Sequence, residues 1–106
     1  MTLTDLRYIV ALARERHFGR AAEKCFVSQP TLSVAVKKLE EELGVILFER
    51  SPQEVRVTPV GQRIVAQAGK VLAEAAQVAE IAAADKGPLV GPLRVGVIFT
   101  IAPWLL

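Results

Sequence analysis

One short stretch of the chain, residues 28–38, combines small hydrogen-bonding side chains with two lysines. If it is helical, and its core stripe is Leu32, Leu39 and Leu43, a rotation of about 100° per residue fixes the opposite face. A helix that enters the DNA major groove by its N-terminal end needs a short, polar and positive face, because bases are read by short side chains near the tip. The predicted face has this character and holds Pro30, Ser33, Val34, Lys37 and Lys38.

Each side chain of this predicted recognition helix has a matching group on double-stranded DNA. Gln29 could bridge N6 and N7 of an adenine, and Ser33 could hydrogen-bond a purine or a pyrimidine edge. Pro30 and Val34 offer apolar surface to thymine methyl groups. The two lysines lie one to two turns further along the helix, from where they would reach phosphates.

Phosphate contacts set affinity and register without reading sequence, so several elements can supply them. The unpaired N–H groups at the start of the recognition helix suit a phosphate. Two arginines fall in a predicted hairpin, from which they could reach a DNA backbone or minor groove. The candidate phosphate contacts are Ser28, Thr31, Arg20, Lys37, Arg50 and Arg56.

Plainer interpretations of the same residues stay open. Lys37 and Lys38 lie at helical spacing from Glu41 and Glu42, so surface ion pairs account for them equally well. The polar residues at the helix start could be ordinary solvated surface. The three consecutive glutamates at 40–42 are expected to form a solvated charge run.

The chain has one cysteine and one histidine, and neither points to metal or redox chemistry. Cys25 lies on an apolar helix stripe and is expected to be a small buried hydrophobe. His17 has no second cluster of ligand-type residues near it, so a loop or cap position is expected. One cysteine allows neither an internal disulfide nor a thiolate-rich metal site, which fits a reducing cytoplasm. No cofactor is expected.

Apolar residues spaced by three and four predict three helices in the first part of the chain. The first spans about 3–15, the second lasts about two turns from residue 18, and the third runs from about 29 to 42. The third helix buries Leu32, Val36, Leu39 and Leu43. The expected N-caps are Thr2 or Thr4 for the first helix and Ser28 for the third, and Gly44 is expected as a left-handed C-cap.

Two β-prone runs follow, at Leu47–Arg50 and Val55–Thr58, and residues 51–54 separate them. This pattern predicts an antiparallel hairpin with a four-residue loop, which after three helices makes a wing. Thr58 and Pro59 then supply an N-cap and a first-turn proline for a fourth helix, which runs from Val60 to about Asp85.

The fourth helix carries apolar residues at alternating steps of four and three, the pattern of a coiled-coil seam. The same residues could instead be core within one chain, yet little of the chain is left to cover them. We therefore expect a homodimer that pairs through this helix. The seam consists of Ile64, Ala68, Val71, Ala75, Val78 and Ala82.

Gly87, Pro88, Gly91 and Pro92 break the helical pattern and predict a hinge. Leu93–Phe99 alternates like a buried strand, and because one strand cannot fold alone, we infer a piece of a longer protein. The predicted fold is mainly α: a winged helix-turn-helix over 1–58, a long C-terminal linker helix for dimerisation over 59–86, and a hinge with the truncated start of an α/β effector domain over 87–106.

Composition bounds the classes of function. The chain has 106 residues, 52% of them hydrophobic and 23% charged, which is typical of one small soluble domain. Its net charge is +2, with ten of the basic residues and eight of the acidic ones in residues 1–63. No signal peptide or membrane-spanning run is recognisable, which favours the cytoplasm. An enzyme is not expected, because there is no paired-carboxylate cleft, nucleophile–base pair or glycine-rich phosphate loop.

Four ordered motifs together resemble the signature of the LysR-type transcriptional regulators, over roughly residues 3–86. Within that family the chain is similar to the OxyR-like, peroxide-responsive subgroup, on the evidence of residues 7–13, 17–18, 25, 28–33 and 91–93. The four motifs are Phe18–Ala22, Val27–Ser33, Leu39–Gly44 and Leu47–Arg50.

The resemblance implies a tetrameric DNA-binding activator or repressor whose linker helices pair, with RNA polymerase as a further partner. It also implies a sensing domain like a periplasmic binding protein after residue 92. In the peroxide-responsive subgroup the reactive cysteines lie in that sensing domain, so Cys25 is not one of them. Many family members carry an arginine where this chain has Val34, which implies a different base preference here.

Two classes of function remain to be separated. A sequence-specific regulator would bind a palindromic operator, because a dimer sets its recognition helices about 34 Å or a multiple apart. It would respond either to peroxide or, as another regulator of this type, to a small-molecule ligand. A protein-interaction or oligomerisation module would instead use the helix at 60–85 and would not bind DNA.

Overall fold

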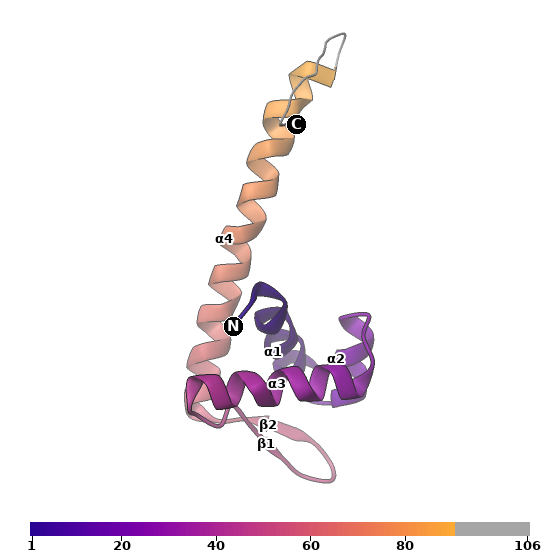
Figure 1. Ribbon diagram of the computed structural model, residues 1–106, viewed down its shortest axis with the longest axis vertical. Coiled ribbons are helices and arrows are strands. Elements are labelled where there is room, and N and C mark those ends of the chain that lie inside the picture. The colour runs from indigo at the N-terminus through magenta and orange to yellow at the C-terminus, as the bar shows by residue number, and fades with distance from the viewer. Residues whose placement is uncertain (91–106) are drawn as a thin grey trace. The chain divides into compact units, whose positions relative to one another are not determined.

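The computed structural model describes the backbone of residues 1–90 and the side chains of residues 1–85. The chain divides into two units, Met1–Ala73 and a second that begins at Glu74. The predicted strand and the second Gly-Pro pair lie outside the described residues. The elements are α1 (Leu3–Glu15), α2 (Phe18–Lys24), α3 (Gln29–Leu43), β1 (Phe48–Arg50), β2 (Val55–Val57) and α4 (Pro59–Val90) (Figure 1).

Local side-chain caps fix where α1 and α2 begin. Thr2, not Thr4, caps α1: its hydroxyl accepts from Asp5 N at 3.1 Å, and Asp5 Oδ2 accepts from Thr2 N at 3.1 Å. Such a capping box satisfies two helix-end donors at once. His17 caps α2, because its Nδ1 accepts from Arg20 N at 3.1 Å. The sequence interpretation of His17 as a cap residue is confirmed.

The third helix begins and ends as predicted to within one residue. Ser28 is the N-cap, with its hydroxyl accepting from Thr31 N at 3.3 Å. Gly44 ends α3 in the left-handed region at φ 73°, where a side chain would be strained. Leu43, expected in the core, is exposed in the last turn, and Leu47 beyond the glycine is buried instead.

The wing is a two-stranded antiparallel hairpin with the predicted four-residue loop. Phe48 pairs with Val57 and Arg50 with Val55. Ser51 closes the loop, since its N and Oγ both donate to Glu54 O, at 3.0 and 2.8 Å. Each strand is one residue shorter than predicted.

The start of α4 is tied to the wing by Thr58. The Thr58 hydroxyl accepts from Gly61 N at 3.0 Å and donates to Ile46 O at 2.6 Å. The helix continues to Val90. The predicted helix end near residue 85 is therefore wrong, and so is the predicted break at residues 87–88.

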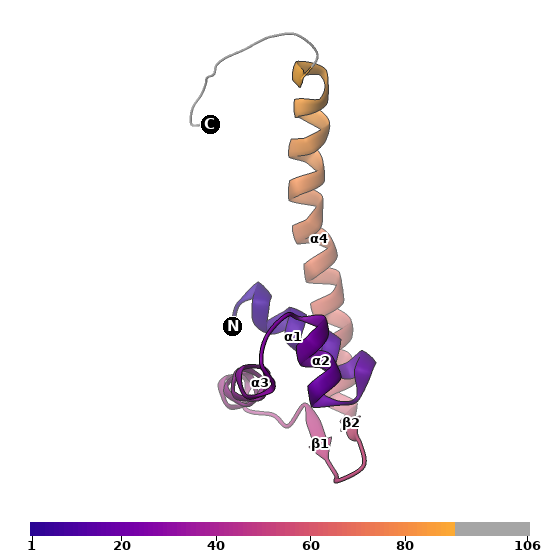
Figure 2. The same cartoon turned by 90° about the vertical axis from the view of Figure 1, so that its right-hand side faces the viewer.

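The core of the first unit lies where α1, α2 and α3 meet, and the hairpin and the start of α4 close it. Figure 2 views α3 along its axis and shows α1 and α2 on one side of it. β2 is joined to the end of α1, because Val55 N donates to Arg16 O at 3.2 Å. The buried apolar residues are Leu6, Ile9, Leu12, Ala21, Ala22, Leu32, Val36, Leu39, Leu47, Phe48, Val55 and Ala68.

The start of the predicted seam belongs to this core. Ala68 is 3% exposed, and Ile64 is half-buried against the same cluster. Ala68 is therefore not free to face a partner chain, which corrects the expectation for it, whereas the seam role of the half-buried Ile64 stays a prediction. The interpretation as core within one chain holds for Ala68, which belongs to the buried apolar cluster of the first unit. Across residues 1–90, no helix is both long and apolar enough to span a membrane.

Candidate nucleic-acid interface

The exposed side of α3 has the residues that the helical projection placed there. Pro30, Lys37 and Lys38 are exposed, and Val34 keeps 58% of its surface exposed although it is apolar. Gln29 is exposed in the first turn. Ser33 is half-buried, because it borders the buried stripe, so it presents less surface than expected.

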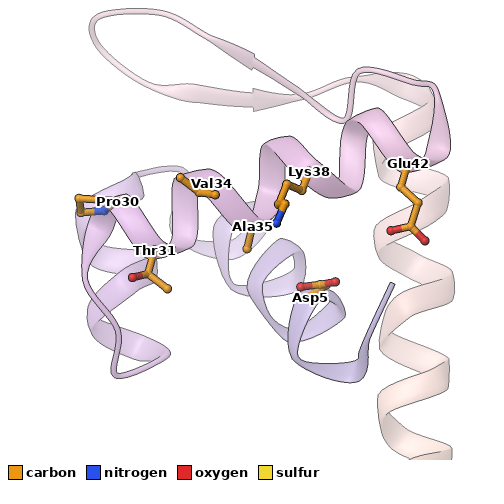
Figure 3. A pocket seen from close by; sticks show the side chains of 7 residues that line it. All are labelled: Asp5, Pro30, Thr31, Val34, Ala35, Lys38 and Glu42. Carbon is orange, nitrogen blue, oxygen red and sulfur yellow. The ribbon is translucent and has the colours of Figure 1, made fainter.

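Four of the predicted site residues line one open groove beside α3. Figure 3 shows their side chains spread along the helix, with Asp5 of α1 across from them. Near the start of α3 the groove is lined by Pro30, Thr31 and Val34. Further along the helix it is lined by Lys38 and by the carboxylates of Asp5 and Glu42. Its lining residues are Asp5, Pro30, Thr31, Val34, Ala35, Lys38 and Glu42.

A second concavity brings Lys37 of α3 together with Arg50 of β1. Glu40, Glu41 and Ile46 also line it. Two of the base-reading candidates, Pro30 and Val34, thus line the first groove, and two cations line the second. A helix inserted into a groove between two DNA backbones presents this division, because phosphates flank the bases.

The start of α3 keeps hydrogen-bonding capacity for a ligand. Ser28 Oγ and Thr31 Oγ1 lie 2.8 Å apart, so one hydroxyl donates to the other. Each hydroxyl has a single hydrogen, and one of the two hydrogens therefore remains available to an outside acceptor. Together with the Gln29 N–H, the one first-turn N–H of α3 without a partner among the described residues, this suits an anionic oxygen.

The two lysines do not form the ion pairs that the spacing allowed. Among residues 1–85, neither Lys37 nor Lys38 lies within 4.0 Å of a carboxylate oxygen. The Glu42 carboxylate instead accepts from the terminal ammonium of Met1, at 2.9 and 2.8 Å. The interpretation of the lysines as members of surface ion pairs is therefore not supported.

The arginine candidates are each held by a neighbour. Arg20 Nε lies 3.8 Å from Glu15 Oε1, and Arg20 Nη2 donates to Glu15 O at 3.3 Å. Arg56 Nε lies 3.4 Å from Glu54 Oε2. Both pairs are exposed and therefore weak, so these arginines can exchange their partner for a phosphate.

Glu40 is a buried residue whose contacts the sequence pattern did not reveal. It is 7% exposed, and its Oε2 accepts from Leu47 N at 2.8 Å and from Phe48 N at 3.1 Å. The expectation of a solvated charge run is wrong for this residue. Glu40 lies four residues after the buried Val36, so helical periodicity places it beside the core. That spacing was the signal that could have identified it.

Two other residues have features that the sequence pattern did not show. Phe26 lies in the turn before α3 with φ 59°, and 94% of its surface is exposed.

Burial raises the pKa of the Cys25 thiol above its ordinary value, and the positive charge of Arg7 opposes that rise. In residues 1–85, no three His, Cys, Asp or Glu side chains group as a metal site would require.

The remaining seam residues of α4 are more exposed than its first turns. Val78 keeps 70% of its surface exposed, and Ile81, which the predicted seam did not include, keeps 67%. Val71 is also exposed, whereas Ala75 is half-buried. The apolar stripe therefore continues past the core of the first unit.

Residues 3–62 match the family described as bacterial regulatory helix-turn-helix proteins, lysR family. That match covers more than half of the chain. The chain belongs to the LysR family. Its relatives are transcriptional regulators, which agrees with the expectation that the chain is not an enzyme.

Known proteins similar to this LysR-family chain include regulators of the peroxide response. It is 49% identical over 106 residues to the Escherichia coli K12 DNA-binding transcriptional dual regulator OxyR, of which it covers 35%. The structure of full-length OxyR C199D from Pseudomonas aeruginosa matches 84% of this chain and 30% of that one, at 68% identity and a TM-score of 0.79. The chain thus spans about a third of the length of the curated relatives it matches.

This chain matches almost the whole length of a second solved structure. The crystal structure titled as a complex of the BenM DNA-binding domain with benA site 1 DNA matches 82% of this chain and 98% of that chain. The identity is 38% and the TM-score 0.76. The predicted fold class, a mainly helical winged helix-turn-helix, is confirmed by these likenesses and by the element order.

Proposed function

We propose that this chain is the DNA-binding part of a LysR-type transcriptional regulator and that it binds double-stranded DNA through α3 and the hairpin. The observation that carries the proposal is the exposed face of α3, with two lysines that have no carboxylate partner among the described residues. The similar BenM domain, whose structure is titled as a DNA complex, supports it.

The proposed interface separates base reading from phosphate binding. Gln29, Pro30, Ser33 and Val34 would face base edges, with the two apolar side chains against thymine methyl groups. Lys38 would follow the backbone beside the first groove. The phosphate contacts would come from Ser28, Thr31, Arg20, Lys37, Arg50 and Arg56.

We further propose that two copies pair through α4 and bind a palindromic operator. The exposed residues Val71, Val78 and Ile81 support pairing, because a solitary helix gains nothing from an apolar stripe in water. Ala75 and Ala82 would complete the contact. We assign residues 1–58 to the DNA-binding winged helix-turn-helix and α4, which replaces the predicted 59–86, to the linker helix, with the start of an effector domain after it.

The signal and the assembly of the whole protein are also proposals. The named relatives make peroxide the favoured inducer, with a small-molecule ligand as the alternative. On this proposal the whole protein is a cytoplasmic tetramer that contacts RNA polymerase. Its sensing cysteines would belong to the sensing domain that the resemblance implies, and Cys25 would not be one of them.

A binding series on palindromic and scrambled DNA tests the central proposal. Gln29→Ala should weaken binding to the palindrome more than to scrambled DNA, whereas Lys37→Ala should weaken both. Loss of one phosphate contact should also lower the slope of log K against log salt by about 0.9. Lys70→Ala, which removes an exposed lysine from α4, is the matched control and should change neither quantity.

The same variants separate the regulator from a pure oligomerisation module. Both Gln29→Ala and Lys37→Ala should still form the proposed dimer when measured by sedimentation. Equal affinity of the unaltered chain for every DNA sequence, or no binding at all while dimers form, would contradict the regulator and favour the module.

A further inference from the structure

The guanidinium of Arg50 is held from two sides by side chains of other elements. Its Nη2 lies 3.7 Å from Glu40 Oε1 of α3. Its Cζ lies 5.1 Å from the centre of the Phe18 ring of α2, a cation–π distance. One arginine at the end of β1 is thus fixed by the two helices of the helix-turn-helix.

The two oxygens of the Glu40 carboxylate have different tasks. Oε2 accepts from Leu47 N and Phe48 N, at 2.8 and 3.1 Å, and so fixes the backbone that enters the hairpin. Oε1 faces Arg50. A neutral amide oxygen could accept from Leu47 N and Phe48 N as Oε2 does. A neutral amide could not replace the negative charge that Oε1 presents to Arg50.

The Arg50 side chain remains exposed enough to bind an anionic ligand as well. The Glu40 and Phe18 contacts occupy only part of a guanidinium that has five N–H donors in one plane. Arg50 and Lys37 line the same concavity, so two cations from different elements converge there. An arginine whose orientation is already set loses less side-chain entropy when it binds an anionic oxygen.

We propose that Glu40 and Phe18 are positioning residues that hold the Arg50 guanidinium for a phosphate of the bound DNA. This inference rests on the proposed DNA-binding function. The plane of Arg50 is set before binding, and the hairpin that carries it is set by the same carboxylate. Lys37 supplies the second positive charge to the same phosphate.

A simple charge argument gives the opposite expectation for one substitution. Removal of a carboxylate from a DNA-binding face makes that face more positive, and long-range attraction alone should then strengthen binding. If Glu40 acts by positioning Arg50, Glu40→Gln should weaken binding instead. The sign of the change therefore distinguishes the two roles.

The test measures affinity and salt slope for the full chain and its variants on one palindromic DNA. Arg50→Met should weaken binding and lower the slope by about 0.9, the value for one lost phosphate contact. Glu40→Gln and Phe18→Leu should each weaken binding by about three- to tenfold, in the lower part of the range of coupling between residues in contact, with the slope nearly unchanged.

Double variants show whether the two residues act through Arg50. In the Arg50→Met background, Glu40→Gln and Phe18→Leu should cause almost no further loss. A residue with a merely structural role would cause the same loss in both backgrounds. Glu40→Gln keeps an amide oxygen to accept from Leu47 N and Phe48 N, and thermal unfolding checks that the fold is retained. If Glu40→Gln unfolds, the Phe18→Leu cycle decides the question.

Three results would overturn the inference. They are tighter binding by Glu40→Gln, equal losses with and without Arg50, and unchanged binding by Arg50→Met. The last result would remove the Arg50 contact but leave the proposed function intact, provided that Gln29→Ala and Lys37→Ala still impair binding. Failure of the unaltered chain to bind DNA would instead refute the proposed function itself.

Discussion

Two glycines in α4 should respond to alanine in opposite ways, although they lie in the same helix. A Cβ on Gly61 would overlap the carbonyl oxygen of Leu47 and would lie 2.9 Å from Thr58 Oγ1 and 3.0 Å from Val57 Cγ1. A Cβ on Gly69 would meet nothing within 4 Å. Gly61 is therefore required by a close approach of two backbones, whereas Gly69 is not.

The magnitude for Gly61→Ala follows from what must move. Leu47 O accepts from Thr58 N at 3.0 Å, so it cannot shift without lengthening this bond; the Thr58 hydroxyl, whose hydrogen goes mainly to Ile46 O at 2.6 Å, lies 3.3 Å from it. Overpacking costs about 1–3 kcal/mol, and a lost hydrogen bond about 0.5–1.5 kcal/mol. Alanine regains about 1 kcal/mol over glycine in a helix. The net loss should be roughly 1–3 kcal/mol.

Thermal and urea unfolding at one protein concentration measure both variants. Gly61→Ala should lower Tm, by about 4–8 °C per kcal/mol at this size. Gly69→Ala should raise stability by up to about 1 kcal/mol, from helix propensity alone. A Gly61→Ala protein as stable as the unaltered chain, or two variants that shift in the same direction, would refute this account of the helix–hairpin junction.

Three further predictions concern single residues. Phe26→Asn should stabilise the chain by roughly 0.5–1 kcal/mol in urea unfolding, because asparagine tolerates a left-handed φ and the exposed ring has no packing to lose; a destabilised variant would show that the ring has a hidden partner. The pKa of Cys25 is raised, so its thiol stays neutral at pH 7 and should react with iodoacetamide more slowly than a free thiol, with the rate rising only at alkaline pH; equal rates at pH 7 would contradict this. Val78→Asp should dissociate the dimer in sedimentation, and the neighbouring Gln77→Asp should not; dimers that survive Val78→Asp would exclude this stripe from the interface.

The local structure was largely predictable, because short-range rules decide it. Ser28, Gly44 and Thr58 mark helix ends by side-chain or backbone chemistry that acts within a few residues. The hairpin loop followed from its composition for the same reason. The exposed face of α3 followed from periodicity, since the stripe of Leu32 and Leu39 fixes its rotation.

The parts that could not be predicted depend on contacts between distant residues. Glu40 looked solvated beside two exposed glutamates, and its burial arises from backbone donors at 47 and 48 that only the fold brings near. The same holds for Arg50, whose partners come from α2 and α3. Ile64 and Ala68 fitted a coiled-coil pattern equally well, because core packing and chain pairing impose similar spacing on a helix.

The burial of Ala68 has a practical consequence for anyone who builds hybrid regulators from this chain. A cut at residue 58, where the sequence motifs of the winged domain end, would remove Ile64 and Ala68 from the hydrophobic cluster and leave its apolar neighbours open to water. The first compact unit ends at Ala73 instead. A donor domain should therefore be joined after residue 73, so that the graft carries with it the helical turns on which its own fold depends.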